Sequence, residues 1–482
     1  MNNLVGETMD VRNPRTGELD FQINVTSQTQ IDTNVTALRG NQVDWHNVGP
    51  AGRAAALLHL SDALQKEFAS LAEALAIDTG RQTFAHFEVA KSIDLVHQWS
   101  KSVCSLFDSL ANAGHSAQVP SVSFQHELVP YPVVAVISPW NVPLLLALLD
   151  AVAALAAGCA VILKPSELTP RFIQPLQRAL DQVPEIAAVL NIVTGGPETG
   201  HAMIEAVDAV CFTGSVPTGQ KVASHAAQCF IPAFLELGGK DPAIIMPDAD
   251  LVLATRAIIR SAIGMTGQTC QSLERIYCHA DIVDKFIAEL LLQLDPLTLT
   301  CSATGSGDIA PLIFMKQADT IQQQVDDAIS KGAKCLRGGH AVHRGGIWYP
   351  PTVLISVDHT MTIMREETFG PILPVMAFSS VEEAITLAND SQYGLSAAVF
   401  SQNIKTAETL ARQLNVGAVS INDASLTGVV NDVEKNSFRA SGMGGSRMGS
   451  AGMVRFLRKR AILTQQAEPV SIALFADTQN PI

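Results

Sequence analysis

VVAVISPWNVPLLLALLDAVAALAAGCAVILK, residues 133–164, is the stretch that decides the fold of this chain. Its first apolar run, Val133–Ser138, predicts a strand, Pro143–Ala157 predicts a helix, and Ala160–Leu163 predicts a second strand. Short apolar strands separated by helices predict parallel crossover units whose sheet is covered on both faces. The stretch is nearly as apolar as a membrane span, but Asp150 interrupts it. A buried helix followed by a buried strand is therefore favoured.

The same alternation continues toward the carboxyl end of the chain. A helix is predicted over Arg171–Gln182, and strands over Asn191–Val193 and Ala209–Phe212. A second series follows residues 238–240, with strands over Ala243–Met246 and Arg275–Cys278, around Val375 and over Ala397–Phe400, and helices from Asp250 and Asp284. We expect an α/β fold with a doubly wound, Rossmann-like cofactor domain and a second α/β domain. The ligand of a doubly wound sheet lies beyond the carboxyl ends of its strands.

The residues before position 133 follow a different pattern. Apolar residues recur at helical spacing over Arg53–Ile77, and Thr83–Leu110 continues in the same way. Alternating residues with three prolines over Val119–Ile137 predict an extended hairpin, a small β arm that reaches out of the body.

The composition bounds the class of protein. At 482 residues the chain exceeds what one hydrophobic core usually supports, so two or three domains are expected. Hydrophobic residues make up 47% and charged residues 16%, which excludes disorder and favours extensive burial. The net charge of −14, without any basic run, argues against a nucleic-acid partner.

Eight cysteines are scattered along the chain without a Cys-x-x-Cys pair. This spacing matches neither a zinc site nor a thioredoxin-like motif, so no metal is expected. The polar N-terminus lacks a signal-peptide pattern, and reduced thiols in the cytoplasm are therefore expected. No membrane association is expected either.

Two short motifs carry residues suited to covalent chemistry. Gly267-Gln268-Thr269-Cys270 contains a thiol that nearby positive charge would turn into a nucleophile, although a Cys in such a turn is usually a small buried apolar residue. Glu236-Leu237-Gly238-Gly239-Lys240 contains a carboxylate beside glycines that permit close backbone approach. Glu236 is a candidate water-activating base, and the alternative is an ion pair between Glu236 and Lys240.

Three further motifs follow strands of the first series. Asn141, after Pro139-Trp140, could donate its side-chain amide to an oxyanion or cap the next helix. Lys164-Pro165-Ser166-Glu167 ends in a carboxylate that could accept both ribose hydroxyls of an adenosine. Gly214-Ser215, followed by Gly219, is a strand-to-helix turn that suits a pyrophosphate, although the Gly-x-Gly-x-x-Gly pattern is absent.

Together and in this order, the motifs resemble the aldehyde dehydrogenase superfamily over about Asn13 to Leu463. The stretches that add to the resemblance are Glu366-Glu367-Thr368-Phe369-Gly370-Pro371, Asn389-Asp390-x-x-Tyr393-Gly394-Leu395 and Ser441-Gly442-Met443-Gly444. The resemblance implies an NAD(P)+-dependent, non-acylating enzyme. Such an enzyme oxidises an aldehyde to a carboxylic acid through a cysteine thiohemiacetal and a thioester.

The resemblance also implies a role for each matching residue. Cys270 corresponds to the nucleophile, Glu236 to the general base, and Asn141 to an oxyanion donor beside the backbone N–H of Cys270. The residues implied in cofactor binding are Trp140, Lys164, Ser166, Glu167, Gly214, Ser215, Gly219, Leu237, Glu367 and Phe369. NAD is expected in preference to NADP, because Glu167 would repel a 2′-phosphate.

The substrate is less well defined by the sequence. The candidates for an apolar pocket lining are Trp140, Val142, Leu145, Leu146 and Leu149, and the alternative for each is plain helix packing. Such a lining favours an uncharged aliphatic or aromatic aldehyde. Arg439 keeps a semialdehyde with a distal carboxylate as a minor option. The chain departs from common family members over Asn436–Ala440, and Gly445–Gly449 lacks the glutamate of a secondary proton relay.

Two alternatives to this function stay open. A relative that transfers the acyl group to coenzyme A would share the fold and the cysteine, but the presence of Glu236 favours hydrolysis. A structural or binding protein without catalysis would share the fold alone.

The predicted domain organisation follows from these assignments. Residues 1–118 and 139–236 are assigned to the cofactor domain, and residues 237–430 to the catalytic domain. Residues 119–138 and 461–482 are assigned to bridging strands. The arm and the tail resemble the bridging sheet of the family, which predicts a homodimer or homotetramer.

Overall fold

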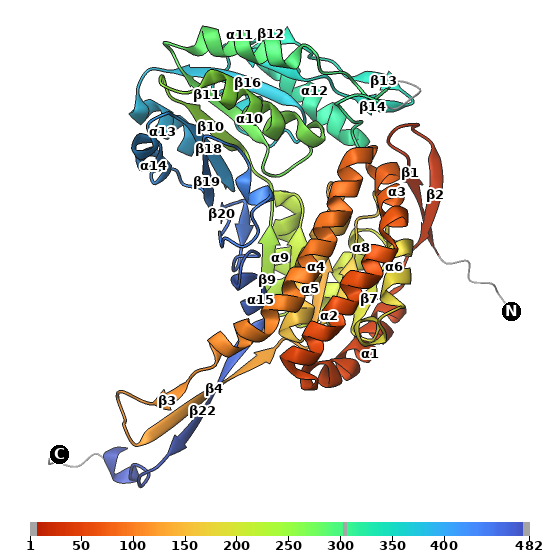
Figure 1. Ribbon diagram of the computed structural model, residues 1–482, viewed down its shortest axis with the longest axis vertical. Coiled ribbons are helices and arrows are strands. Elements are labelled where there is room, and N and C mark those ends of the chain that lie inside the picture. The colour runs from red at the N-terminus through yellow and green to blue at the C-terminus, as the bar shows by residue number, and fades with distance from the viewer. Residues whose placement is uncertain (1–6, 302–305, 476–482) are drawn as a thin grey trace.

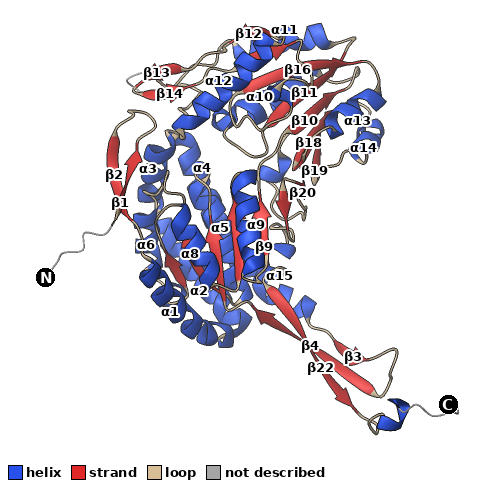
Figure 2. Ribbon diagram, turned by 180° about the vertical axis from the view of Figure 1, so that it is seen from behind, coloured by secondary structure: helices blue, strands red, loops and turns tan. Residues whose placement is uncertain are grey.

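The computed structural model describes residues 7–301 and 306–475. The chain forms two α/β bodies, each built on one large sheet, and a long β arm that projects from the first body (Figure 1). Seen from behind, the strands of each body lie among helices, and the arm consists of strands with the short 3₁₀ helix Ile472–Phe475 at its tip (Figure 2). The predicted fold class is confirmed.

The first body is built on a six-stranded sheet, called the first sheet below. Its order is β21 (Gly442–Met443), β9 (Ala233–Glu236), β8 (Ala209–Thr213), β5 (Val133–Ile137), β6 (Ala160–Lys164) and β7 (Leu190–Ile192). All neighbours are parallel except β21 and β9. The strand order reverses at β5, because β6 lies on one side of it and β8 on the other. The central strands β5, β6 and β8 are buried along their whole length, as parallel strands covered on both faces must be.

Helices cover both faces of this sheet. They are α1 (Gln28–Asn47), α2 (Gly49–Lys66), α3 (Phe68–Thr79), α4 (Gln82–Leu110), α5 (Pro143–Ala157), α6 (Ile173–Leu180), α7 (Pro184–Ala187), α8 (Pro197–Ala206), α9 (Val216–Gln228) and α15 (Ala451–Val454). The predicted sequence of strand, buried helix and strand over residues 133–164 is thus β5, α5 and β6. In the described part of the chain, no helix combines the length and the hydrophobicity needed to cross a membrane.

The second body is built on a seven-stranded sheet, called the second sheet below. Its order is β12 (Lys334–Arg337), β15 (Thr352–Ile355), β16 (Ile372–Phe378), β11 (Leu273–His279), β10 (Asp241–Ile245), β18 (Ser396–Phe400) and β19 (Ala418–Ile421). Only the edge strand β12 is antiparallel to its neighbour. The helices are α10 (Leu251–Ile263), α11 (Val283–Leu294), α12 (Met315–Ser330), α13 (Val381–Asn389) and α14 (Ile404–Ala411).

Three two-stranded sheets in the described ranges lie outside the two large sheets. They pair β1 (Thr8–Arg12) with β2 (Leu19–Asn24), β13 (Val342–Arg344) with β14 (Gly346–Trp348), and β17 (Tyr393–Gly394) with β20 (Phe438–Arg439). The turn after β1 touches the turn before β14, where the backbone N–H of Gly346 donates to the Arg15 carbonyl at 3.0 Å. This contact joins the N-terminal hairpin of the first body to the second body.

The arm consists of β3 (Ala113–His115), β4 (Val122–Pro130) and β22 (Leu457–Gln465), with β4 in the middle. Two of the predicted arm boundaries are wrong. Val133–Ile137 was expected in the arm but forms β5 in the middle of the first sheet, because the prolines at 130 and 132 end the arm strand. The second arm strand begins at Leu457 rather than Ala461, in register with Pro130. The predicted tail beyond Phe475 and residues 1–6 lie outside the described residues.

A buried charge cluster fastens α5 to the segment around α15. The carboxylate of Asp150 accepts hydrogen bonds from the guanidinium groups of Arg447, at 2.7 Å, and of Arg455. All three side chains are almost completely buried. The interruption that Asp150 makes in the apolar stretch is therefore a tether between segments about 300 residues apart.

Removing this carboxylate should destabilise the protein. Asp150→Ala leaves two buried guanidinium groups without their anion, and breaking such a pair typically costs about 3–5 kcal/mol. We expect a melting temperature several degrees lower in scanning calorimetry. Glu408→Ala, which removes the exposed pair with Arg412, is the matched control and should leave the melting temperature unchanged. Equal melting temperatures for the two variants would contradict this account.

Candidate active site

One large cavity lies where the two bodies meet. Its volume is about 980 Å³, at the upper end of the range for small-molecule sites. Its walls come from the carboxyl ends of β5, β6, β8 and β9 and from three loops that lead into strands of the second sheet. The cavity lining includes Asn141, Glu236 and Cys270, together with every predicted cofactor-binding residue except Gly219.

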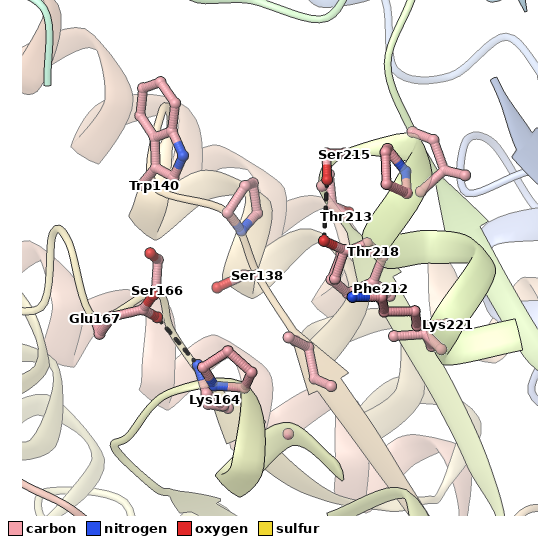
Figure 3. Close-up of a pocket in the computed structure, with 18 of the residues that line it drawn as sticks. Ser138, Trp140, Lys164, Ser166, Glu167, Phe212, Thr213, Ser215, Thr218 and Lys221 are labelled. Carbon is pink, nitrogen blue, oxygen red and sulfur yellow. Dashed lines mark hydrogen bonds and ion pairs between the residues drawn. The ribbon is translucent and has the colours of Figure 1, made fainter. Parts of the chain in front are cut away.

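The first end of the cavity carries charged and hydroxyl groups (Figure 3). Lys164 and Glu167, at the end of β6, lie 3.4 Å apart from Nζ to Oε2. Across the cavity, Ser215 at the N-terminus of α9 donates to the hydroxyl of Thr218 at 3.0 Å. Burial lowers the pKa of Lys164, and Glu167 opposes this effect.

Gly219 does not line the cavity but lies next to Leu237, which does. A Cβ atom at this position would lie 2.5 Å from Cδ2 of Leu237, so the glycine leaves the space that the Leu237 side chain fills. Leu237 in turn lines the cavity.

The opposite end of the cavity is formed by an acidic and aromatic loop. Phe369 has a left-handed backbone, with φ of 50°, and its ring packs edge-on against Trp140 at 5.4 Å between centroids. Glu367 Oε1 accepts the backbone N–H of Gly239 at 3.1 Å. Burial, together with the neighbouring carboxylate of Glu274, raises the pKa of Glu367 to about 8. The unliganded site therefore holds this carboxyl largely in its neutral form at pH 7.

Cys270 lies in the loop between the 3₁₀ turn Gly264–Gly267 and β11. Met265 and Thr266 both have left-handed backbones, with φ of 53° and 60°, a conformation that costs free energy for residues with a Cβ atom. The buried Gln268 side chain holds this loop: it accepts the N–H of Ile313 at 2.9 Å and donates to two carbonyls. The nucleophile candidate therefore sits on a loop fixed by the surrounding structure.

Burial raises the pKa of the Cys270 thiol to about 12, and Lys435 acts in the opposite direction. The nearby carboxyl groups of Glu367, Asp241 and Glu236 contribute to this raised pKa. The thiol is therefore protonated at neutral pH in the unliganded protein, and it needs an additional source of positive charge or a base to react.

Glu236 is the last residue of β9. The sequence left open that it forms an ion pair with Lys240 instead of acting as a base. The structure excludes that pair, because Lys240 binds Glu274 at 2.8 Å and the hydroxyl of Thr368. Glu236 Oε2 instead accepts the hydroxyl of Ser437 at 2.7 Å and lies 3.5 Å from Lys435 Nζ. The sequence analysis did not single out Lys435 or Ser437 as site residues.

Asn141 is buried beside the Cys270 loop. Its side-chain amide donates to the carbonyl of Gln268 at 3.0 Å, and its own carbonyl accepts from Arg81 at 2.9 Å. Arg81 also donates to the carbonyl of Met265 at 2.9 Å, so one guanidinium ties both segments together. The alternative role of Asn141 as a helix cap is not seen: Glu88 accepts the first free N–H groups of α5 instead.

The predicted substrate-pocket residues Val142, Leu145 and Leu149 do not line this cavity; of the candidates on α5 only Leu146 does. The helix begins directly after Val142, and its other apolar residues pack into the core of the first body. Arg439 donates to the backbone carbonyls of Asn389 and Ser391 and is likewise absent from the lining. Leu145 and Leu149 therefore serve helix packing, and Arg439 holds the backbone around Asn389 and Ser391.

A histidine pair at the outer rim was also missed. His201 on α8 and His225 on α9 line the cavity with their rings stacked at 3.7 Å, and Glu205 lies 3.7 Å from each. These three side chains are of the types that bind metal ions, and their potential ligand atoms lie within 4.8 Å of one another. Parallel stacked rings direct their nitrogen lone pairs along parallel planes, so the lone pairs do not converge on one ion without a ring rotation.

The donor set fits a dinucleotide. The hydroxyl of Ser138, which directly follows β5, is buried and has no hydrogen-bond partner among the described residues. The same holds for Nε2 of His225. Both residues line the cavity, which also contains the N-terminal turn of α9, where backbone N–H groups favour phosphate. A ligand with several hydroxyl and phosphate groups would satisfy these positions.

The comparison with known proteins decides the family. The profile described as "Aldehyde dehydrogenase family" matches residues 2–462, nearly the whole chain. The chain belongs to the aldehyde dehydrogenase family. The family resemblance and the enzyme class predicted from the sequence are confirmed.

Three relatives illustrate how this dehydrogenase compares with others. The solved structure of PutA from Anabaena variabilis, named as an aldehyde dehydrogenase, shares 46% identity and a TM-score of 0.94, covering 97% of this chain and 99% of that one. The 4,4′-diapolycopene aldehyde oxidase of a Methylomonas species is 38% identical, covering 86% of this chain and 78% of its own. The betaine aldehyde dehydrogenase of Staphylococcus aureus, solved as a point mutant with NAD+, is 29% identical with a TM-score of 0.90, covering 98% and 96%.

The glycine beside the Cys270 loop provides a test of the site geometry. A Cβ atom at Gly239 would lie 2.5 Å from the carbonyl oxygen of Cys270, so Gly239→Ala must displace the loop of the nucleophile candidate. Small misplacements of reacting groups cost about 100-fold in rate, and we expect a loss of that order in aldehyde oxidation. Gly264→Ala is the matched control, because no atom lies within 4 Å of its added methyl group. If both variants kept the activity of the parent enzyme, the close approach would be irrelevant to catalysis.

Proposed function

We propose that this dehydrogenase oxidises an aldehyde to a carboxylic acid with NAD(P)+, using Cys270 as nucleophile and Glu236 as general base. The observation that carries the proposal is that the Cys270 thiol and the Glu236 carboxylate line the same cavity as the ribose- and phosphate-type donors. Family membership supports the reaction class, and the site supplies the assignment of roles to residues.

The Cys270 thiol loses its proton to solvent, and the thiolate sulfur attacks the carbonyl carbon, so that a C–S bond forms as the carbonyl oxygen becomes negative. The amide of Asn141 and the backbone N–H of Cys270 donate to this oxygen; one such donor is worth on the order of 10²–10³ in rate. Bound NAD(P)+ supplies the hydride acceptor that turns the thiohemiacetal into a thioester. Glu236 then takes a proton from water, whose oxygen attacks the acyl carbon. The C–S bond breaks, and the acid and the Cys270 thiolate are released.

Replacing the base should separate the two halves of the reaction. Glu236→Gln keeps the thiol but lacks a proton acceptor for water, so thioester formation should proceed and hydrolysis should stop. In stopped-flow absorbance, NADH should form once per active site, with steady turnover at least about 100-fold below the parent enzyme. Cys270→Ala is the control and should give neither phase. Unchanged turnover in Glu236→Gln would exclude this residue as the base.

The same assay separates the two alternatives. The parent enzyme should form NADH over many turnovers without coenzyme A, since water is the acyl acceptor. A single burst that only coenzyme A extends would favour the acylating alternative. An absence of both NAD binding and Cys270 alkylation would favour a non-catalytic protein.

The residues proposed to hold the cofactor divide between the two ends of the cavity. Lys164, Ser166 and Glu167 would hold the adenosine ribose, and Gly214 and Ser215 the pyrophosphate. Glu367 would hold the nicotinamide ribose, with Trp140, Leu237 and Phe369 nearby. The proposed preference is NAD, because the Glu167 carboxylate lies where a 2′-phosphate would meet like charge.

Glu167 allows a direct test of cofactor choice. Glu167→Gln removes the negative charge and leaves Lys164 free to bind a phosphate, so we expect the kcat/KM ratio of NADP to NAD to rise about tenfold or more. The measurement is initial-rate kinetics with both cofactors at one aldehyde concentration. A ratio equal to that of the parent enzyme would place the discrimination elsewhere.

The remaining proposals concern the substrate and the assembly. An apolar aliphatic or aromatic aldehyde is favoured by Trp140, Leu146 and the Phe314 ring in the cavity lining. Assembly as a homodimer or homotetramer is favoured by the arm and tail, where Leu463 and Phe475 expose 67% and 78% of their surface. The predicted limits of the cofactor and catalytic domains and the cytoplasmic location stay predictions.

A further inference from the structure

Lys435 and Ser437 lie behind Glu236 and have no part in the mechanism above. The Lys435 side chain is nearly completely buried, and its Nζ donates to Ser437 Oγ at 3.2 Å and reaches Glu236 Oε2 at 3.5 Å. Ser437 donates to the same carboxylate oxygen at 2.7 Å. A buried ammonium and a hydroxyl thus converge on one oxygen of the proposed base.

The fold holds these two side chains in place. Strand β21 pairs with β9 so that Gly442 lies opposite Glu236, and the backbone N–H of Leu237 donates to the Ser441 carbonyl at 2.9 Å. A Cβ atom at Gly442 would lie 2.7 Å from Cβ of Ser437, so this glycine allows Ser437 to approach the strand. The backbone N–H of Lys435 donates to the hydroxyl of Ser446 at 3.2 Å.

The charges around the reacting groups give Lys435 a distinct position. The thiol of Cys270 faces the carboxyl groups of Glu236, Glu367 and Asp241, and Lys435 is the cation that acts against them. The other buried ammonium nearby, that of Lys240, is engaged by Glu274 and Thr368. Lys435 therefore supplies positive charge beside the Cys270 thiol, whereas Glu236 also faces the buried guanidinium of Arg455.

We propose that Lys435 and Ser437 are positioning residues for the two reacting groups. Ser437 fixes the orientation of the Glu236 carboxylate, and the Lys435 ammonium stabilises negative charge on the Cys270 sulfur as it reacts. The proposal rests on the function proposed above for Glu236 and Cys270. It assigns a role to the segment Asn436–Ala440, in which this chain departs from the common family pattern and whose neighbour, Gly445–Gly449, carries no glutamate.

The electrostatic part is tested without cofactor or aldehyde. The rate of Cys270 alkylation by iodoacetamide is measured from pH 6 to 10 in the parent enzyme and in Lys435→Met, Lys435→Arg and Ser437→Ala, with Cys270→Ala to subtract the other thiols. Alkylation follows the thiolate fraction, and a shift of one pKa unit changes it tenfold. We expect Lys435→Met to react about tenfold more slowly at each pH below the pKa. Lys435→Arg and Ser437→Ala, which keep the charge, should react like the parent.

The positioning part is tested by turnover. Ser437→Ala should keep the stoichiometric NADH burst and lower steady-state kcat about tenfold with little change in KM, because the base loses its hydrogen bond but not its charge. Thermal melting verifies that each variant is folded, and Lys435→Gln replaces Lys435→Met if the latter does not fold. Unchanged alkylation in the uncharged variants together with unchanged kcat in Ser437→Ala would overturn the proposal. A parent enzyme that alkylates at Cys270 but oxidises no aldehyde would instead overturn the proposed function.

Discussion

The close approach of three backbone loops around Cys270 is the constraint on which the rest of the site depends. A Cβ atom at Gly239 would meet the Cys270 carbonyl at 2.5 Å, and one at Gly267 would meet the Gly370 carbonyl at 2.2 Å. One at Gly238 would lie 2.3 Å from Oε2 of Glu367. Because all three positions lack side chains, the thiol loop, the acidic loop and the end of β9 can share one small volume.

The topology explains why these loops meet there. The first sheet contributes the carboxyl ends of its strands, where Asn141, Lys164 and Glu236 follow β5, β6 and β9. The second sheet contributes the loops that lead into its strands, since Cys270 precedes β11 and Phe369 precedes β16. The rule that ligands lie beyond carboxyl ends thus holds for the first sheet only. The second sheet instead presents the starts of its strands to the same cavity.

The sequence predicted most of this arrangement where local motifs carried it. The strand and helix pattern over residues 133–164 located β5, α5 and β6, and the motif around Cys270 predicted a residue that lines the cavity. The Glu236 motif did the same, although no local pattern shows that Glu236 and Cys270 line one cavity. Only the conjunction of motifs, through the family resemblance, pointed to that proximity.

The errors came from features that depend on tertiary structure. Leu145 and Leu149 were candidates for the pocket, but a helix that is apolar on every side does not reveal which residue faces a ligand. The arm limit was misplaced because Val133–Ile137 is apolar enough to fit either an arm strand or a core strand. Lys435 and Ser437 were missed because they reach Glu236 from about 200 residues away, through pairing of the two-residue strand β21. The departure of Asn436–Ala440 from the common family pattern was the signal in the sequence that could have pointed to Ser437.

Burial and charge together determine the protonation state of the unliganded site. Loss of hydration raises the pKa of Cys270 to about 12 and of Glu367 to about 8, so these two groups hold protons rather than charges near neutrality. It raises the pKa of Asp241 to about 7, so that this carboxyl titrates near neutrality. A ligand that donates hydrogen bonds to Glu367 favours its ionised form, and by linkage an ionised Glu367 favours that ligand. Cofactor binding and ionisation of the acidic loop are therefore expected to be coupled. An ionised Glu367 disfavours the Cys270 thiolate through like-charge repulsion. A cation such as Lys435, which acts on the thiol in the opposite direction, offsets this repulsion.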